Sequence, residues 1–181
     1  MKIIIMGPQG CGKSTQAKLL SKNLKIPSVS SGDIFRELKN TNTLLGKRVV
    51  ERLSKGLLVS DDDTMDVINQ ELSKKEYKKG FIIDGFPRNL YQAQNSLFKP
   101  DLVLYLEVPL EVSVERLTRR MREDDTPDLI RIRLSEYHTN TRPVLDFYES
   151  FGVLRSIDGN ATAENVHKSA VMEVYSALKV N

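Results

Sequence analysis

A glycine-rich segment near the start of the chain has the residue types and spacing of a phosphate-binding loop. Residues 7–14 read G-P-Q-G-C-G-K-S and match the pattern G-x-x-x-x-G-K-S. Glycines let such a loop turn tightly and aim backbone N–H groups at phosphate oxygens, and Lys13 adds a positive charge. The segment therefore predicts binding of a nucleoside triphosphate, and the alternative is an ordinary glycine turn before a helix. The residues expected to contact the triphosphate here are Gly10, Cys11, Gly12, Lys13, Ser14 and Thr15.

Side chains near this loop could hold the metal ion that accompanies a triphosphate. Ser14 or Thr15 can place a hydroxyl beside Mg²⁺, and Asp84 ends an apolar segment with a carboxylate. We therefore expect Ser14 and Asp84 to hold Mg²⁺, directly or through water.

Short apolar segments alternate with longer amphipathic stretches, which is the pattern of strands joined by helices into a parallel sheet. Strands are expected at 2–6, 81–84, 102–108 and 152–157, with a weaker candidate at 27–29. Helices are expected at 12–24, 32–39, 44–54, 62–74, 89–98, 110–121, 127–150 and 162–178. Start signals for these helices include Thr43, the acidic run 61–63 and Thr162. The predicted fold class is α/β, a three-layer fold of the P-loop NTPase type with a five-stranded parallel sheet flanked by helices.

The composition fits one compact domain that binds neither nucleic acid nor a membrane. The chain has 181 residues, of which 40% are apolar, and its formal charge of +3 comes from 27 basic and 24 acidic residues spread along it. The opening apolar run is too short for a signal sequence or a membrane span. The single cysteine, Cys11, cannot form an internal disulfide, which favours a cytoplasmic setting. Cys11 is either a reactive thiol beside Lys13 or a small filler residue.

A phosphate-binding loop does not say where the phosphoryl group goes, and residues further along the chain bear on that question. Segments 30–36 (S-S-G-D-I-F-R), 56–59 (G-L-L-V) and 84–88 (D-G-F-P-R), together with Gln92, resemble the adenylate kinase family. The resemblance continues through 115–120 (E-R-L-T-R-R), 122–125 (R-E-D-D), Arg133 and 158–159 (D-G). It covers nearly the whole chain, and several motifs in a fixed order are far more specific than one.

The resemblance implies a single domain of three parts: a core at 1–29, 60–120 and 128–181, a helical insertion at 30–59 for the nucleoside monophosphate, and a very short lid at 121–127. Only Met121 separates Arg120 from Arg122, where many members insert a loop or a folded lid, so the chain resembles the short-lid bacterial subgroup. Such a lid has no zinc ligands. The implied activity is Mg²⁺-dependent, reversible phosphoryl transfer from ATP to AMP to give two ADP, by an enzyme expected to be a monomer.

For the acceptor side, the resemblance implies arginines that grip the phosphate and an amide that reads the base. Arg36 and Arg88 match the family's phosphate-binding arginines, a task suited to a planar guanidinium. Gln92 matches a glutamine that hydrogen-bonds to the adenine of AMP, which favours AMP over UMP or CMP. Ser31, where threonine is common, and Asn89, which is also seen in pyrimidine-specific relatives, keep a UMP/CMP kinase as the alternative. The implied AMP-binding residues are Ser31, Arg36, Leu57, Leu58, Val59, Gly85, Phe86, Pro87, Arg88, Gln92, Arg122 and Arg133.

For the transfer step, the resemblance implies cations around the moving group rather than a catalytic base. The implied catalytic residues are Lys13, Arg88, Arg116, Arg120, Arg122 and Arg133, and Arg116, Arg120 and Ala161 complete the ATP-binding set. The competing interpretation is a basic helical surface that pairs with Asp124, Asp125 and Glu136. A regulatory P-loop NTPase and a kinase for another small molecule are remoter alternatives, because neither needs the acceptor-side motifs.

Overall fold

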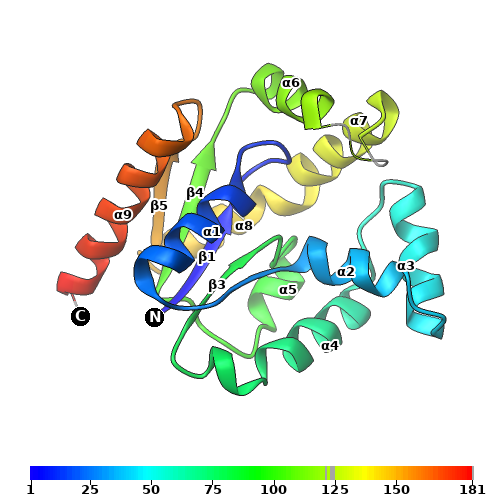
Figure 1. Cartoon of the computed structure of the whole chain (residues 1–181), viewed down its shortest axis with the longest axis horizontal. Helices are drawn as coiled ribbons and strands as arrows, with labels where there is room; N and C mark the ends of the chain where they lie inside the picture. Colours follow the sequence, from blue (N-terminus) through cyan, green and yellow to red (C-terminus); the bar gives the residue numbers. More distant parts are fainter. Residues whose placement is uncertain (121, 123–124, 181) are drawn as a thin grey trace.

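The computed structural model describes residues 1–120, 122 and 125–180. Within these residues the strands form one five-stranded sheet in the order β2-β3-β1-β4-β5, and every pairing is parallel (Figure 1). The strands are β1 Lys2–Met6, β2 Ser28–Ser30, β3 Phe81–Asp84, β4 Leu102–Glu107 and β5 Leu154–Asp158. This arrangement confirms the predicted α/β class, because parallel neighbours need crossover connections and helices supply them.

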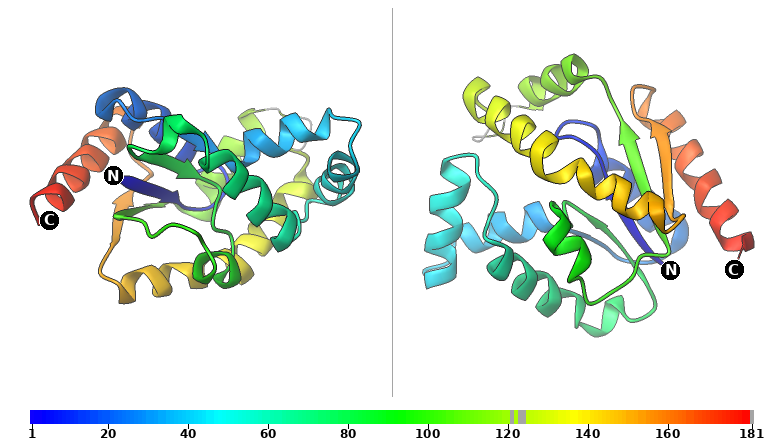
Figure 2. Two further views of the ribbon diagram at one scale, coloured as in Figure 1. Left: turned by 90° about the horizontal axis from the view of Figure 1, so that it is seen from below. Right: turned by 180° about the vertical axis from the view of Figure 1, so that it is seen from behind.

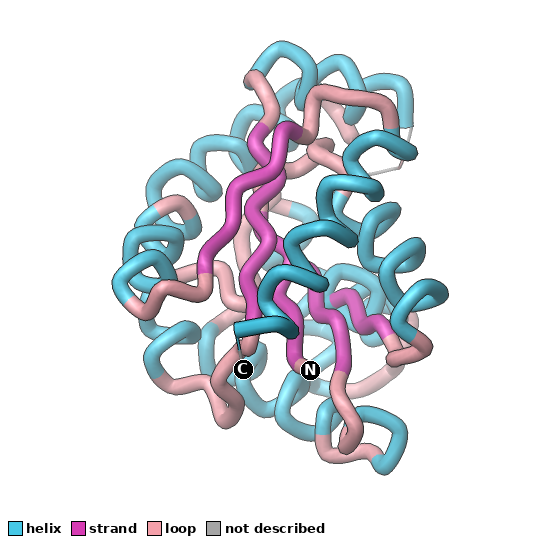
Figure 3. The backbone as a smooth tube through the Cα atoms, turned by 90° about the vertical axis from the view of Figure 1, so that its left-hand side faces the viewer, coloured by secondary structure: helices cyan, strands magenta, loops and turns pink. Residues whose placement is uncertain are grey.

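Helices cover both faces of this sheet. They are α1 Lys13–Leu24, α2 Ser31–Lys39, α3 Leu44–Ser54, α4 Asp61–Leu72, η1 Lys75–Tyr77, α5 Leu90–Gln94, α6 Leu110–Arg120, α7 Pro127–Glu136, η2 Tyr137–Thr141, α8 Pro143–Ser150 and α9 Ala163–Val180. Side chains alternate across a strand, so Ile3 and Ile5 of β1 pack in one apolar cluster with α1 and α9. Ile4 and Met6 pack in the opposite cluster with α5 and α8. Figures 2 and 3 show the strands lying between these two layers.

Side-chain caps fix the starts of the helices that border the predicted acceptor site. Thr43 accepts a hydrogen bond from the Gly46 N–H at 3.0 Å, and Ser60 accepts one from the Asp63 N–H at 3.3 Å. Such caps satisfy N–H groups that have no partner within the helix. The start signals expected at Thr43 and at the acidic run 61–63 are confirmed, with Ser60 as the cap of the second.

The helix predicted at 127–150 is interrupted, and this part of the prediction is wrong. The chain is α-helical to Glu136, continues as the π-type turn η2, and resumes as α8. Pro143 has no N–H to donate, and in a regular α-helix its ring would collide with the carbonyl four residues earlier. The Arg142 N–H instead bonds to the Tyr137 carbonyl at 2.9 Å, so one extra residue is taken up in this turn.

The helix predicted at 89–98 is also shorter than expected, because α5 ends at Gln94. The Asn95 side-chain amide donates to the carbonyl of Tyr91 at 2.8 Å, and such local side-chain bonds compete with continuation of a helix. Strands β1 and β3 have the predicted bounds, and the ends of β2, β4 and β5 differ from the predictions by one or two residues.

The carboxyl ends of the strands open toward two groups of helices. Figure 1 shows α2 and α3 on one side of this region and α6 and α7 on the other. Helices α2 and α3 pack in a small apolar cluster that includes Phe35 and Val49 and also contains Val67 of α4. In the described part of the chain, no helix is both long and apolar enough to cross a membrane.

Candidate functional site

A cleft of about 1340 Å³ lies at the carboxyl ends of β1 and β3. It is lined by the glycine-rich loop, by residues of α2 and α3, and by arginines from α6 and α7. The predicted site residues along its wall are Gly10, Cys11, Gly12, Lys13, Ser14, Thr15, Arg36, Leu57, Leu58, Val59, Asp84, Gly85, Phe86, Pro87, Arg88, Gln92, Arg116, Arg120, Arg122, Arg133 and Ala161. Ser31 instead lies fully buried behind the wall, where its hydroxyl donates to the Gly85 carbonyl at 2.7 Å.

The glycine-rich loop has the conformation that its spacing predicts. Gly7 and Gly10 have φ values of 143° and 87°, and a Cβ at either position would come within 2.6 Å of the carbonyl oxygen of Leu106 or 2.5 Å of that of Ser113. Only glycine fits such positions. Helix α1 starts directly after the loop and has no side-chain cap, so its first N–H groups can bind an anion in the cleft.

Lys13 lies folded against this loop. Its ammonium group donates to the carbonyl oxygens of Gly7 at 2.8 Å and Pro8 at 2.7 Å. These backbone contacts must be exchanged before the ammonium reaches a bound phosphate. Cys11 is only 2% exposed and packs within the apolar cluster beneath the loop, which favours its interpretation as a filler residue.

Asp84 and Ser14 both line the cleft, as a magnesium site for a nucleotide requires. Asp84 ends β3, is 4% exposed, and accepts a hydrogen bond from the Ser30 hydroxyl at 3.0 Å. Mg²⁺ bound to a nucleotide usually takes one or two protein ligands, with phosphates and water as the others. One carboxylate and one hydroxyl fit this role. Among the described residues no cluster of histidine, cysteine and carboxylate side chains could hold a metal by itself.

Positive charge converges at the start of α5. Arg88 donates its Nε–H to the Gly85 carbonyl at 2.8 Å. Burial lowers the pKa of this guanidinium; Asp84 acts in the opposite direction, and the positive charges of Arg133 and Arg36 lower the pKa further. Since like charges repel at short range, an anion bound among these arginines would relieve the repulsion.

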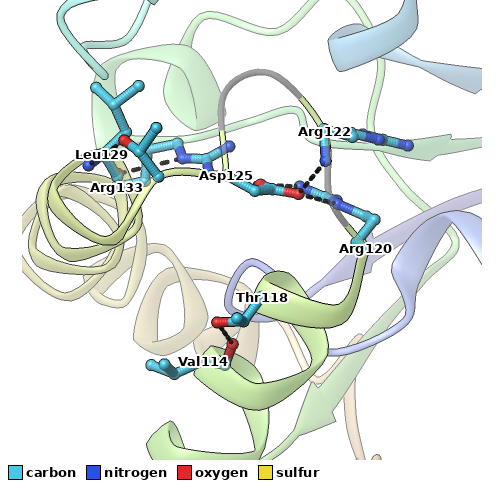
Figure 4. Close-up of polar contacts among 8 residues, drawn as sticks. Val114, Thr118, Arg120, Arg122, Asp125, Leu129 and Arg133 are labelled. Atoms are coloured by element: carbon cyan, nitrogen blue, oxygen red, sulfur yellow. Dashed lines mark hydrogen bonds and ion pairs between the residues drawn. The ribbon is translucent and has the colours of Figure 1, made fainter.

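A second group of arginines is held by a carboxylate between α6 and α7; we call it the Asp125 cluster. Arg120 makes a bidentate pair with Asp125 at 2.8 and 2.7 Å, and Arg133 donates to the same carboxylate at 2.9 Å (Figure 4). The Arg122 N–H also donates to it at 3.3 Å. Burial alone would raise the pKa of Asp125, but these bonds to Arg120 and Arg133 lower it to about 2.

The Asp125 cluster bears on two expectations from the sequence. Pairing of the basic residues with Asp125 is what the competing interpretation of a structural basic surface expected, yet the same arginines line the cleft. Glu136 instead accepts from the Asn140 side chain at 2.9 Å. Met121, Glu123 and Asp124, which belong to the predicted lid at 121–127, lie outside the described residues.

The cleft is also bordered by the middle of α6 and by the loop after β5. Arg116 donates to the Gly159 carbonyl at 3.0 Å, and Ala161 lies in the same loop. The 158–159 motif therefore holds an arginine in place.

Gln92 lies in the cleft wall with its amide already bonded. Its Nε2 donates to Asp61 at 2.7 Å, and its Oε1 accepts the Arg88 N–H at 2.8 Å. Asp61 was not predicted as a site residue, because an acidic residue in the first turn of a helix needs no other explanation.

Two further cleft residues, which the sequence did not predict, come from η2. Tyr137 and Thr141 line the cleft, and the Thr141 hydroxyl donates to the Arg88 carbonyl at 2.8 Å. The available signal was Pro143, which breaks a helical pattern, since π-type turns are frequent at functional sites.

Known proteins of one family resemble this chain over most of its length. The adenylate kinase family model matches residues 5–153. An adenylate kinase of Cyanothece sp. (strain PCC 7425) is 43% identical, with 98% of this chain and 96% of that protein covered. Adenylate kinases of Xylella fastidiosa (strain 9a5c) and Clostridium kluyveri (strain ATCC 8527) are 39% and 35% identical, over 95% and 94% of this chain and 98% and 96% of the relatives. The chain belongs to the adenylate kinase family.

Proposed function

We propose that this chain catalyses reversible phosphoryl transfer from ATP to AMP, giving two ADP. The observation that carries the proposal is the presence in one cleft of two separate regions whose groups can bind an anion. One is the glycine-rich loop with Lys13, and the other is the group formed by Arg36, Arg88 and Arg133. A nucleotide hydrolase needs only the first region, whereas transfer to a second phosphate needs both.

The donor side is assigned to the glycine-rich loop. The N–H groups of the loop and of α1 would hold the phosphates of ATP, and Lys13 would leave its loop carbonyls to contact the β- and γ-phosphates. Ser14 and Asp84 would hold Mg²⁺, directly or through water, and the metal would neutralise charge on the phosphates. Arg116 and Ala161 would border the rest of the donor nucleotide.

The acceptor side is assigned to the region between α2, α3 and the start of α5. Arg36 and Arg88 would bind the phosphate of AMP through charge-assisted, bidentate hydrogen bonds. Gln92 would face the base, and residues Leu57, Leu58 and Val59 would border it. Ser31 would act from behind the wall, through its hydrogen bond to Gly85.

Transfer would depend on positioning and charge rather than on a general base. A phosphoryl group in transit carries negative charge on its equatorial oxygens, and arginines around it stabilise that charge. Arg116, Arg120, Arg122 and Arg133 line the cleft from α6, α7 and the segment between them. For Arg120 and Arg133, binding of phosphate would replace the contacts to Asp125.

The three-part organisation, core 1–29, 60–120 and 128–181, acceptor insertion 30–59 and short lid 121–127, is part of this proposal. Phe35 of α2 and Val49 of α3 share one apolar cluster, which supports an insertion built from these two helices and packed against Val67 of α4. The Clostridium alignment runs over 208 positions, although it covers 94% of this 181-residue chain, so that relative has extra residues within the aligned region.

We propose that the enzyme works as a monomer, in the cytoplasm where its nucleotides are found.

The alternative, a UMP/CMP kinase, depended in part on Asn89. In the structure the Asn89 side chain caps α5 by accepting the Gln92 N–H at 2.9 Å and donates to Asp61 at 2.7 Å. Both contacts are internal, so asparagine here has a structural explanation that does not involve a pyrimidine.

The proposal is tested by a coupled assay of ADP formation from MgATP with AMP, CMP, UMP, GMP or dAMP as acceptor. We expect AMP to have the highest kcat/KM, and a preference for CMP or UMP would contradict the assignment. Gln92→Ala should raise the KM for AMP by about tenfold and weaken base discrimination, because a hydrogen-bonding amide is lost. ATP binding, measured by calorimetry, should be unchanged. Unchanged discrimination would refute the role of Gln92.

A further inference from the structure

Gln92, Asp61 and Asn89 form a closed set of hydrogen bonds at the wall of the cleft, which we call the amide network. The two amide NH₂ groups both donate to Asp61 Oδ1, each at 2.7 Å. Gln92 is 1% exposed, and Asp61 comes from a different element, the first residue of α4. The network therefore joins α4 to the start of α5.

Backbone groups define which way each amide points. The Arg88 N–H donates to Oε1 of Gln92 at 2.8 Å, and the Gln92 N–H donates to Oδ1 of Asn89 at 2.9 Å. A backbone N–H can only donate, so both bonded atoms must be oxygens. Each NH₂ group then faces Asp61, whose carboxylate can only accept. If the Gln92 amide were turned over, a donor would face the Arg88 N–H and an oxygen would face the carboxylate.

The fixed amide has one N–H and one oxygen lone pair left for a ligand, because a glutamine side chain has two donors and two lone pairs in all. Adenine offers an amino group at position 6 beside an acceptor nitrogen at position 1, which matches this pair. Hypoxanthine offers an oxygen at position 6 beside an N–H at position 1, which is the reverse pattern. An amide free to turn over would pair with either base, whereas a fixed one pairs only with the first.

We propose that Asp61 is a positioning residue for acceptor selection, which fixes the orientation of the Gln92 amide so that the site takes 6-aminopurines and rejects 6-oxopurines. The inference rests on the proposed function, in which Gln92 faces the acceptor base. Cytosine also has an amino group beside an acceptor nitrogen, so the amide network does not separate AMP from CMP. The comparison that isolates the network is AMP against IMP, since their bases differ only in this pair of groups.

The test is the ratio of kcat/KM for AMP to that for IMP, measured with MgATP. Asp61→Ala should lower this ratio by about tenfold, because turning the amide over then leaves only the Arg88 N–H without an acceptor. Asp61→Ser is measured alongside, since serine is well tolerated at a helix start and also withdraws the carboxylate. Asp61→Asn keeps an oxygen that can accept both NH₂ groups, so it should keep the ratio within about threefold of the wild type.

Controls separate this role from a contribution to folding. Asp62→Ala removes a neighbouring exposed carboxylate of the same helix turn and should leave the ratio unchanged. Asn89→Ala removes the cap of α5 and should lower the melting temperature while the AMP to IMP ratio is largely kept. A purely structural role of Asp61 would lower the melting temperature without changing the ratio.

Two results would overturn the inference and leave the proposed function standing. The first is a wild-type enzyme that uses IMP as well as AMP. The second is an unchanged ratio in Asp61→Ala and Asp61→Ser when Gln92→Ala reduces it. If Gln92→Ala also leaves the ratio unchanged, the assignment of Gln92 itself fails, and if neither nucleotide accepts phosphate, the proposed function fails with it.

Discussion

The amide network and the Asp125 cluster lie in walls of the same cleft, but their polar groups are satisfied in different ways. In the amide network, backbone N–H groups and Asp61 fix the amides of Gln92 and Asn89, and a bound base would need none of these bonds to break. In the Asp125 cluster, Arg120 and Arg133 are bound to an internal carboxylate. In the proposed function, phosphate oxygens would compete with Asp125 for the same guanidinium groups.

In the proposed function, the groups that recognise the base and those that stabilise the transferred phosphoryl group are therefore prepared differently. The amide that would recognise the base is already oriented, which favours specificity because an incorrect base leaves buried polar groups unpaired. Arg120 and Arg133 are bound to a carboxylate, and in the proposed function they would exchange it for phosphate oxygens. Such an exchange would couple catalysis to movement of α6, α7 and the segment between them.

The largest effect is expected from removal of Arg88. Its backbone N–H bonds to Gln92 of the amide network, and its guanidinium lies close enough to Arg133 of the Asp125 cluster to be affected by that charge. Arg88→Ala should lower kcat/KM for AMP by about 10³, because the partly buried cation that we propose binds the acceptor phosphate is lost. The matched control is Arg119→Ala, since Arg119 is 79% exposed and pairs with Glu115 on the surface of α6. Activity close to normal in Arg88→Ala would remove the acceptor-phosphate assignment.

A smaller loss is expected when one arginine of the Asp125 cluster is removed. Arg120→Ala should lower kcat by about 10², less than the loss of a sole arginine would, because in the proposed function Arg116, Arg122 and Arg133 also stabilise the transition-state charge. The KM for AMP should change little in comparison. Steady-state kinetics with both substrates varied measures the two effects separately, and an equal effect in Arg119→Ala would mean that surface charge rather than contact is responsible.

The third prediction concerns stability and pH. The pKa of Asp125 is lowered from its ordinary value of 3.8 to about 2 in the folded chain, so its contribution to stability is fully present above about pH 4 and is lost as the pH falls through 2. Asp125→Asn should therefore lower the free energy of unfolding by about 2 kcal/mol at pH 7, and this difference should shrink toward zero near pH 2.

Urea denaturation of wild type and Asp125→Asn at pH 7, 4, 3 and 2 measures this difference. Asp128→Asn is the control, because Asp128 is 85% exposed and its pair with Arg131 is 3.5 Å long. If the difference in free energy of unfolding between wild type and Asp125→Asn persists unchanged at pH 2, the ionised carboxylate of Asp125 is not the source of the stabilisation.

Most of the cleft could be predicted from the sequence, because its parts follow from short motifs. The glycine spacing at 7–14 defines a loop that a Cβ at Gly7 or Gly10 would block, and the end of β3 brings Asp84 next to it. Arg88 and Gln92 are four residues apart, so the cap at Asn89 places both at the same edge.

The remaining features depend on contacts between distant segments, which spacing does not reveal. Asp61 has an adequate local explanation at the start of α4, and only the fold brings it to Gln92, 31 residues later. Thr141 reaches Arg88 across 53 residues, through a turn that Pro143 creates. The sequence predicted a continuous helix there because the apolar periodicity continues past the proline.

Following the labelled γ-phosphate of ATP in the presence and absence of AMP tests whether the cleft holds a donor site and an acceptor site. If the two anion-binding regions form a donor and an acceptor site, the label should appear in the β-position of ADP, only when AMP is present, and this transfer should be lost in Arg88→Ala. Release of the label as inorganic phosphate at the same rate with and without AMP would contradict the account.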